Sequence, residues 1–152
     1  MGGVAVSEEG LVDPHKLLRV LEDVATRHAK TVKALNRVLV RLRRDPYDEE
    51  LQSLALTYIK RLRTLRSRLM GVLNGAVRLE DVTDEIRGNI ATLSEYMIIV
   101  GAELERDLLK KSIVLGRRGA RLLSNAEDEI RNDLQELDSI VEKLQDIVDR
   151  YY

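Results

Sequence analysis

Cysteine, phenylalanine and tryptophan are all absent from this chain of 152 residues. Without cysteine, disulfide bonds and thiolate metal sites are excluded. Without phenylalanine and tryptophan, the core must be built from leucine, isoleucine, valine, alanine and methionine, which favours helices that pack along narrow seams. Proline and glycine are also scarce, at two and nine residues, which leaves little room for the turns of a sheet protein. The composition therefore predicts an all-α fold, and the length fits one domain.

Long apolar runs are missing too. The longest candidate, Met97-Ile98-Ile99-Val100, is bounded by Glu95 and Glu103. It is far shorter than the roughly 20 residues that span a bilayer. The first residues lack the basic and apolar regions of a secretory signal. We therefore expect a soluble cytoplasmic protein, and abundant arginine, glutamate and leucine without cysteine are compatible with a thermophilic source.

Apolar residues recur at alternating steps of three and four over residues 14–44, which predicts a helix with a heptad seam. Asp13 is a favourable N-cap, and Pro14 fits the first helical turn. Pro46 ends the helix, because proline disfavours helical geometry in the residue before it. A second heptad seam over residues 47–73 begins a few residues later. The two helices are therefore expected to form an antiparallel hairpin.

The second half of the chain predicts three further helices, over residues 79–110, 112–123 and 125–151. Asn74-Gly75 is consistent either with a break or with one long helix that continues through the glycine at a cost of about 1 kcal/mol. Ser124 and Glu127 have the spacing of a capping box, which would open the last helix. With residues 1–12 as a flexible arm and 13–152 as one helical domain, we expect the hairpin to extend to a bundle of four or five helices.

Acidic and basic residues are sorted into separate blocks, although the net charge is only −1. Seven bases and no acid lie between Arg27 and Arg44, and nine acids with two bases lie between Glu127 and Asp149. A second acid-free basic segment covers residues 110–123. Blocks of opposite sign on one chain suggest either self-docking or a surface offered to an anionic partner.

Five bases of the first block fall on the side of their helix opposite the apolar seam, and we call them the basic ridge: Lys30, Lys33, Arg37, Arg41 and Arg44. Steps of three and four residues align them over roughly 20 Å. Three interpretations stay open. The ridge is a solvated helix face, a cradle for the acidic last helix of the same or another copy, or a surface that follows the phosphates of nucleic acid or anionic lipid.

In the second interpretation, acids of the last helix would cover the ridge and act as an autoinhibitor: Glu127, Asp128, Glu129, Asp133 and Glu136. A ridge of one sign repels itself, which favours an acidic group against it. The ridge carries no aromatic stacking platform, so base-specific recognition of a single strand is not expected.

No group of residues has the spacing of a catalytic, cofactor or metal site. The two histidines lack acidic partners in the Glu-x-x-His pattern of di-iron bundles. His28 lies in the heptad seam, so we expect a buried, hydrogen-bonded side chain or a register-setting polar residue rather than a ligand. The segment Gly116-Arg117-Arg118-Gly119 lacks the Lys-Ser/Thr of a phosphate-binding loop. Gly88 and Gly101 interrupt helical stretches, which either a close helix approach or a local kink would explain. We expect no enzymatic activity, no cofactor and no small-molecule substrate.

The order of these elements resembles the ESCRT-III polymer family, in particular its archaeal division paralogues. The basic block, the turn at Asp45-Pro46 and the second-helix run match the family's basic hairpin. Ala76-Val77-Arg78-Leu79-Glu80-Asp81-Val82 resembles the Arg-Leu-Glu-x-(Ile/Val) stretch late in the archaeal second helix. The likeness covers residues 15–110. The chain departs from the family at Asn74-Gly75 and in its long last helix, and it shows no motif for recruiting the disassembly ATPase.

The resemblance implies a self-assembling scaffold for membrane remodelling in cell division. Subunits would open, stack their hairpins and lay the basic ridge against an acidic membrane. Two other functions stay open. One is a nucleic-acid-associated helical subunit of a ribonucleoprotein or filament coat, and the other is a dimeric helical adaptor whose seams a second copy completes.

Overall fold

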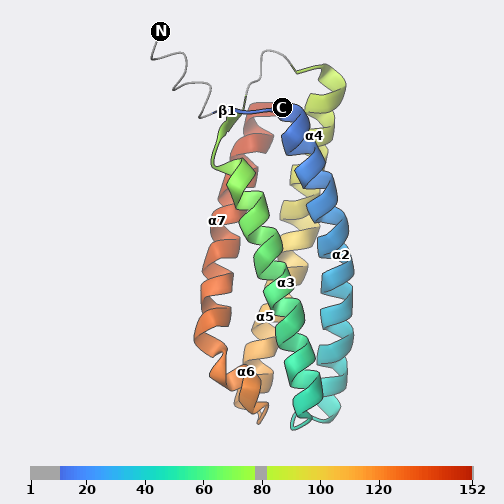
Figure 1. The fold of residues 1–152 in the computed structure, drawn as a ribbon, viewed down its shortest axis with the longest axis vertical. Helices are drawn as coiled ribbons and strands as arrows, with labels where there is room; N and C mark the ends of the chain where they lie inside the picture. The colour runs from blue at the N-terminus through green and yellow to red at the C-terminus, as the bar shows by residue number, and fades with distance from the viewer. Residues whose placement is uncertain (1–10, 78–81, 152) are drawn as a thin grey trace.

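The computed structural model describes residues 11–77 and 82–151, which form an all-α bundle (Figure 1). Its helices are α2 (Pro14–Arg44), α3 (Glu49–Leu73), α4 (Asp84–Tyr96), α5 (Ala102–Arg117), α6 (Arg121–Asn125) and α7 (Glu127–Tyr151). A π-helix, η1 (Met97–Gly101), joins α4 to α5. Near one end, β1 (Leu11–Val12) pairs in parallel with β2 (Ala76–Val77), with Leu11 opposite Ala76.

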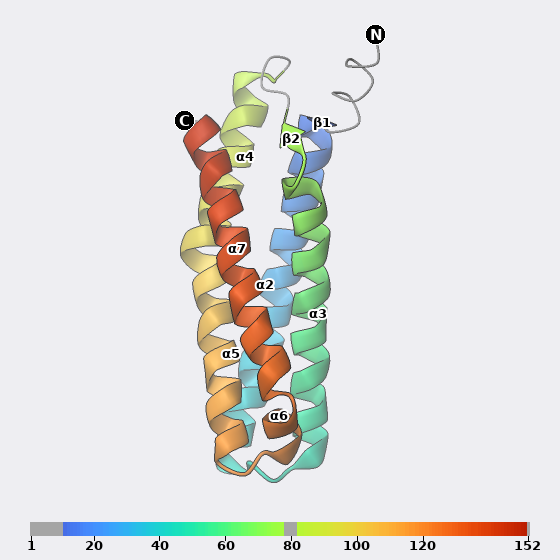
Figure 2. The ribbon, with the colours of Figure 1, turned by 90° about the vertical axis from the view of Figure 1, so that its left-hand side faces the viewer.

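Four long rods make up the bundle: α2, α3, the continuous α4–η1–α5 rod, and α7. In Figure 2, α7 lies in front, α5 and α3 lie at the two sides, and α2 lies behind. Figure 1 shows the same order from the side, with α3 in front of α5 between α7 and α2. The helices α2 and α7 therefore occupy diagonally opposite corners, and each packs between α3 and the α4–α5 rod.

The polar residues at the helix starts follow ordinary capping rules. Asp13 Oδ1 accepts a hydrogen bond from the His15 backbone N–H at 3.0 Å, and Asp48 Oδ1 accepts one from the Leu51 backbone N–H at 3.1 Å. The predicted hairpin of α2 and α3 is confirmed, with α3 beginning at Glu49. Helix α3 ends at Leu73, so of the two interpretations of Asn74-Gly75 the structure has the break.

The predicted boundaries in the second half are partly wrong. Residues 79–81 lie outside the described residues, and α4 begins at Asp84, after the Thr83 cap. Helix α5 then runs without a break through 110–112 to Arg117, because its buried apolar residues continue at helical spacing. The turn that ends it contains Gly119, whose φ of +119° favours glycine.

Ser124 does not cap the last helix. It lies inside α6, where its backbone N–H donates to the Ala120 carbonyl at 2.9 Å. The predicted flexible arm also needs correction at its end, because Leu11 and Val12 pair with β2. Residues 1–10 lie outside the described residues. Ala76 and Val77, which begin the stretch resembling the archaeal second helix, form β2 rather than helix.

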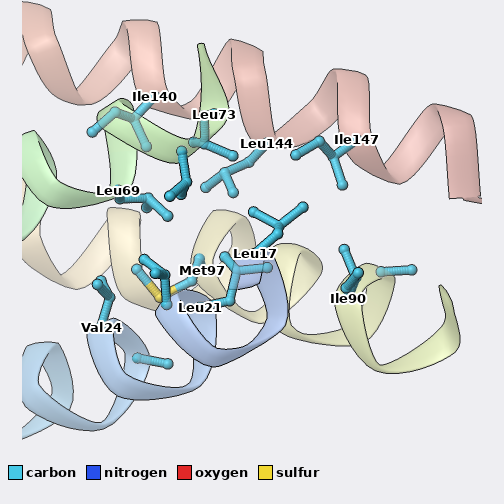
Figure 3. Close-up of a cluster of buried hydrophobic side chains, with 14 of the residues drawn as sticks. Leu17, Leu21, Val24, Leu69, Leu73, Ile90, Met97, Ile140, Leu144 and Ile147 are labelled. Carbon is cyan, nitrogen blue, oxygen red and sulfur yellow. The ribbon is translucent and has the colours of Figure 1, made fainter. Parts of the chain in front are cut away.

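The core consists of two apolar clusters stacked along the bundle axis. Figure 3 shows the one that joins α2, α3, α4, η1 and α7, with Leu21, Leu69 and Leu144 among its fully buried side chains. The second cluster joins α2, α3, α5, α6 and the start of α7, around Leu35, Leu62 and Leu109. A layer of charged side chains lies at the level between them.

Candidate functional site

The basic ridge lies on the outer surface of α2. The core-facing side of this helix carries Leu35, Leu39 and Leu42, which turns the ridge away from the bundle. All five ridge side chains are exposed: Lys30, Lys33, Arg37, Arg41 and Arg44. Across residues 11–77 and 82–151, no ion pair includes any of them.

The second basic segment lies beside the ridge, although 65 residues lie between Arg44 and Lys110 along the chain. Arg43 and Val40 of α2 line one hollow together with Lys110 and Arg118 of the α5 end. The two acid-free blocks therefore meet on one face, because α2 and α5 lie side by side and run in the same direction (Figure 1). We define the basic face as the ridge with these neighbours: Lys30, Lys33, Arg37, Arg41, Arg43, Arg44, Lys110 and Arg118.

Two adjoining hollows, each with a volume of about 290 Å³, form a groove between α2 and α5. One is lined by Ala29, Lys33 and Leu104 among others, and both share Asn36 and Asp107. We call this depression the α2–α5 groove. It follows the helix axes, so its shape suits an elongated partner rather than a compact ligand.

The predicted cover of the ridge by α7 does not form within this chain, because α7 stands on the opposite corner of the bundle. Its acids instead pair with arginines of α3 and α5. Asp133 binds Arg63 through two hydrogen bonds of 2.7 and 2.8 Å. Asp133 also pairs with Arg66. The other pairs are Glu129 with Arg63 at 3.7 Å, Glu136 with Arg66 at 3.5 Å, Asp138 with Arg106 at 2.8 Å, and Glu127 with Arg117 at 3.1 Å.

These pairs also shift the pKa values of the groups involved. The hydrogen bond to Asp133 raises the pKa of Arg63 above its usual value, and the bond to Asp138 does the same for Arg106. Hydrogen bonds from Arg117 and Arg131 hold the pKa of Glu127 below the usual range. Asp128, by contrast, is exposed and takes part in none of the ion pairs among the described residues. Contact between α7 and the ridge of another copy stays a prediction.

A buried ionic layer connects all four rods at the middle of the bundle. His28 Nε2 lies 2.7 Å from Glu105 Oε1, and Arg66 pairs with both Glu105 and Asp133. Arg63 completes the layer from the edge of the bundle. The exposed fraction is 4% for His28 and Arg66 and 1% for Glu105 and Asp133. Two carboxylates face two guanidinium groups, which is the condition under which buried charges are tolerated.

The prediction that His28 is buried and hydrogen-bonded is confirmed. The burial of Arg66, Glu105 and Asp133 was not predicted. A signal was present, because each occupies a core-facing position at helical spacing from buried apolar neighbours, as Asp133 does between Ile130 and Leu137.

Gly101 is the last residue of the π-helix η1 and lies beside this layer. A Cβ atom on Gly101 would lie 3.3 Å from Met97 Sδ and 3.5 Å from His28 Cε1. The contact with α2 has an ordinary van der Waals distance, and the π-helix that ends at Gly101 is a local irregularity of the helix. Close helix approach does not explain Gly88, because no atom lies within 4 Å of the position that a Cβ would take there. A small cavity of about 10 Å³ borders His28, Arg66 and Glu105, close to the volume that one water molecule requires.

Within the part of the chain that the structure describes, no three histidine, aspartate or glutamate side chains gather where they could hold a metal ion. No described helix has both the length and the apolar character needed to cross a bilayer. Comparison of the chain with protein-family models, with curated proteins and with solved structures found no match.

Proposed function

We propose that the chain is a non-enzymatic helical scaffold that binds an anionic partner through the basic face. The observation that carries this proposal is the contrast between two sets of bases. The arginines that face α7 are paired with its acids, as Arg63 is with Asp133. The bases of the basic face have no acidic partner among the described residues, although they come from two distant segments.

Electrostatics gives this contrast a physical meaning. Like charges on one helix face repel each other and lower the stability of the free chain. An anionic partner removes that repulsion. Near an anionic surface, each lysine or arginine contributes about 1 kcal/mol of attraction, so several aligned bases are enough for stable docking.

The bundle supplies a rigid platform for such a face. The ionic layer ties α2 to α3, α5 and α7 through His28, Glu105, Arg66 and Asp133, and apolar clusters lie on both sides of the layer. The bases therefore keep their spacing on a fixed surface, which lowers the entropic cost of binding.

Self-assembly is a second candidate, and the diagonal placement of α2 and α7 favours it. The outward side of α7 carries exposed acids, including Glu142 and Asp146, that form no ion pair within the described residues. A chain cannot bring this side onto its own ridge, but one copy can present it to the next. Such a head-to-tail contact is heterologous and produces rings or filaments. It agrees with the homo-oligomer and the ESCRT-III-like polymer expected from the sequence.

The test compares three anionic probes on the full chain. Vesicles with anionic lipid, a DNA duplex and polyglutamate are each titrated at low and at high salt, while light scattering follows self-association. We expect binding that weakens steeply with salt. The double variant Arg37→Glu with Arg41→Glu should lose it. The matched control is Lys60→Glu with Arg61→Glu, which makes the same charge change at exposed positions of α3, outside both the basic face and α7.

Each outcome identifies a partner class or removes the proposal. Preference for vesicles supports the membrane function implied by the resemblance, and preference for DNA supports the nucleic-acid alternative. If the face variant and the control behave alike with every probe and in self-association, the basic face is only a solvated surface.

A further inference from the structure

The α2–α5 groove is more apolar than the ridge beside it. Three of its wall residues are large, apolar and about half exposed: Leu104 at 48%, Val40 at 45% and Val114 at 44%. Below them the groove reaches the buried side chains of Leu39, Leu108 and Leu115. An apolar floor between charged rims is typical of a binding surface rather than of an ordinary solvated helix face.

Three of the five residues along the α2 wall of the groove have short side chains, which leaves room between Lys33 and Arg43. Ala29, Asn36 and Val40 follow one another at steps of seven and four, so they lie on one side of the helix. Longer residues at these positions would close the contact between α2 and α5, as they do in the core below.

The spacing of the wall residues matches the dimensions of a third helix. On α2 the lining runs through Ala29, Lys33, Asn36, Val40 and Arg43, and on α5 through Leu104, Asp107, Lys111, Val114 and Arg118. Both series alternate steps of three and four, which is the pattern that accepts the apolar seam of a packed helix. The α2 wall spans roughly 21 Å at 1.5 Å per residue, which corresponds to about four helical turns.

The charges on the rim determine the chemistry of the occupant. Lys33 and Arg43 line one side, and Lys110, Lys111 and Arg118 line the other. The acid between them, Asp107, is paired with Lys111 at 2.8 Å. An occupant must therefore be apolar along one stripe and acidic on its flanks. The same face of a second copy is excluded by like charge, a bilayer is too flat to enter the groove, and a phosphate backbone has no apolar stripe to cover Val40 and Leu104.

We propose that the α2–α5 groove binds an acidic amphipathic helix of a partner protein, about four turns long. This inference rests on the proposed function and names its partner class. The apolar stripe of the helix would bury Val40, Leu104 and Val114. Its carboxylates would meet the rim bases, which supply orientation and fast association.

The experiment uses a synthetic helical peptide of about 15 residues, long enough to fill the groove. It carries leucine at heptad positions a and d and glutamate elsewhere, with a hydrocarbon staple that keeps it helical. A scrambled peptide of the same composition lacks the stripe. Binding to the full chain is measured by isothermal titration calorimetry. We expect the striped peptide to bind at least about tenfold more tightly than the scrambled one, because burial of an apolar stripe distinguishes them.

Two groove variants, Val40→Asp and Leu104→Asp, test the site directly. Each places a carboxylate in the apolar stripe, and each should weaken binding of the striped peptide by about tenfold or more. The matched control is Leu54→Asp, because Leu54 is 39% exposed on α3, outside the groove. Circular dichroism confirms folding, and Val40→Ser with Leu104→Ser replaces any variant that fails to fold.

The results separate this inference from the proposed function. If Arg37→Glu with Arg41→Glu abolishes polyanion binding while the groove variants bind the striped peptide as the parent does, the helix site is overturned and the anion-binding scaffold stands. Equal binding of striped and scrambled peptides also overturns the helix site. If neither the ridge nor the groove variants change any binding, both proposals fail.

Discussion

Arg66 and Glu105 form an ion pair at the centre of the bundle, where each is almost completely shielded from water. Arg66 belongs to α3 and Glu105 to α5, which lie on opposite corners of the bundle. Their pairing, extended to His28 and Asp133, fixes the height at which the four rods meet. A shift of α3, α5 or α7 by one turn would separate Arg66 from a buried carboxylate, so the layer specifies one register for these rods.

Removal of one member of the layer should therefore destabilise the bundle strongly. In Asp133→Ala, Arg66 keeps the buried Glu105 and the exposed Glu136 but loses one of its two buried carboxylates, and Arg63 loses both of its hydrogen bonds. We expect the free energy of unfolding to fall by about 3–5 kcal/mol, measured by urea denaturation. The control is Asp128→Ala on the same helix, at an exposed position outside the ion pairs, which should stay within about 0.5 kcal/mol.

Replacement of the whole layer should have the opposite effect on stability. The combined variant His28→Leu, Arg66→Met, Glu105→Leu and Asp133→Leu removes the desolvation cost of the buried charges together with their attraction. Such exchanges are neutral or stabilising by about 1–4 kcal/mol. We expect unfolding at equal or higher urea concentration, with a less uniform state detected as broadened amide resonances. A loss of stability as large as that of Asp133→Ala would show that the layer is a net source of stability.

Much of the fold could be predicted from the spacing of the apolar residues in the sequence. The seams of 14–44 and 47–73 predicted α2, α3 and their antiparallel hairpin, and the position of His28 in a seam predicted its burial. The acids of α7 were harder to place. Their partners Arg63, Arg66 and Arg106 come from helices distant in sequence, and charge alone does not tell which basic surface an acidic helix faces.

The candidate site was predictable in parts but not as a whole. Both basic blocks are visible in the sequence, and the ridge positions are exposed as their spacing predicts. The two basic blocks form one face only because α2 and α5 are neighbours in the bundle. The placement of α4 diagonally opposite α3 makes α2 and α5 neighbours, and local patterns do not encode it.

Two glycines should respond in opposite ways to the same substitution. Gly88→Ala adds a methyl group on α4 where no atom lies within 4 Å. It should stabilise the chain by about 0.5–1 kcal/mol, because alanine loses less backbone entropy in a helix. In Gly116→Ala the new carbon would lie 2.8 Å from the Ser124 backbone nitrogen. Because α6 must then move, we expect a loss of about 1–3 kcal/mol in thermal or urea unfolding. Equal effects would mean that α5 and α6 do not pack as closely as described.

Stability at high pH should depend on Tyr151. Burial raises the pKa of its hydroxyl above the usual value of 10.0, and this hydroxyl has no hydrogen-bond partner among the described residues. A raised pKa in the folded state means that the stabilising contribution is present below pH 10 and is lost as the pH rises through the folded pKa. The free energy of unfolding should therefore be lower near pH 11 than at pH 8 in the parent, and the difference should be smaller in Tyr151→Phe. The phenylalanine variant should be at least as stable near neutral pH, since it removes an unpaired buried oxygen.

Complementary charge reversals on α2 and α7 should distinguish head-to-tail assembly from binding of an unrelated partner. One variant, Arg37→Glu with Arg41→Glu, reverses the charge of two ridge positions and keeps the acids of α7. The other, Glu142→Lys with Asp146→Lys, reverses the charge of two positions on the outward side of α7 and keeps the ridge. All four positions are exposed, so both variants should fold.

If the ridge of one copy binds α7 of the next, neither variant should assemble alone at low salt, because its ridge and its α7 carry charges of the same sign. An equimolar mixture should assemble, because the acidic ridge of the first variant meets the basic α7 of the second. Light scattering measures the three samples beside the parent. A parent chain that stays monomeric at low salt, or a mixture no larger than its components, rules out this contact and leaves the basic face to a different partner.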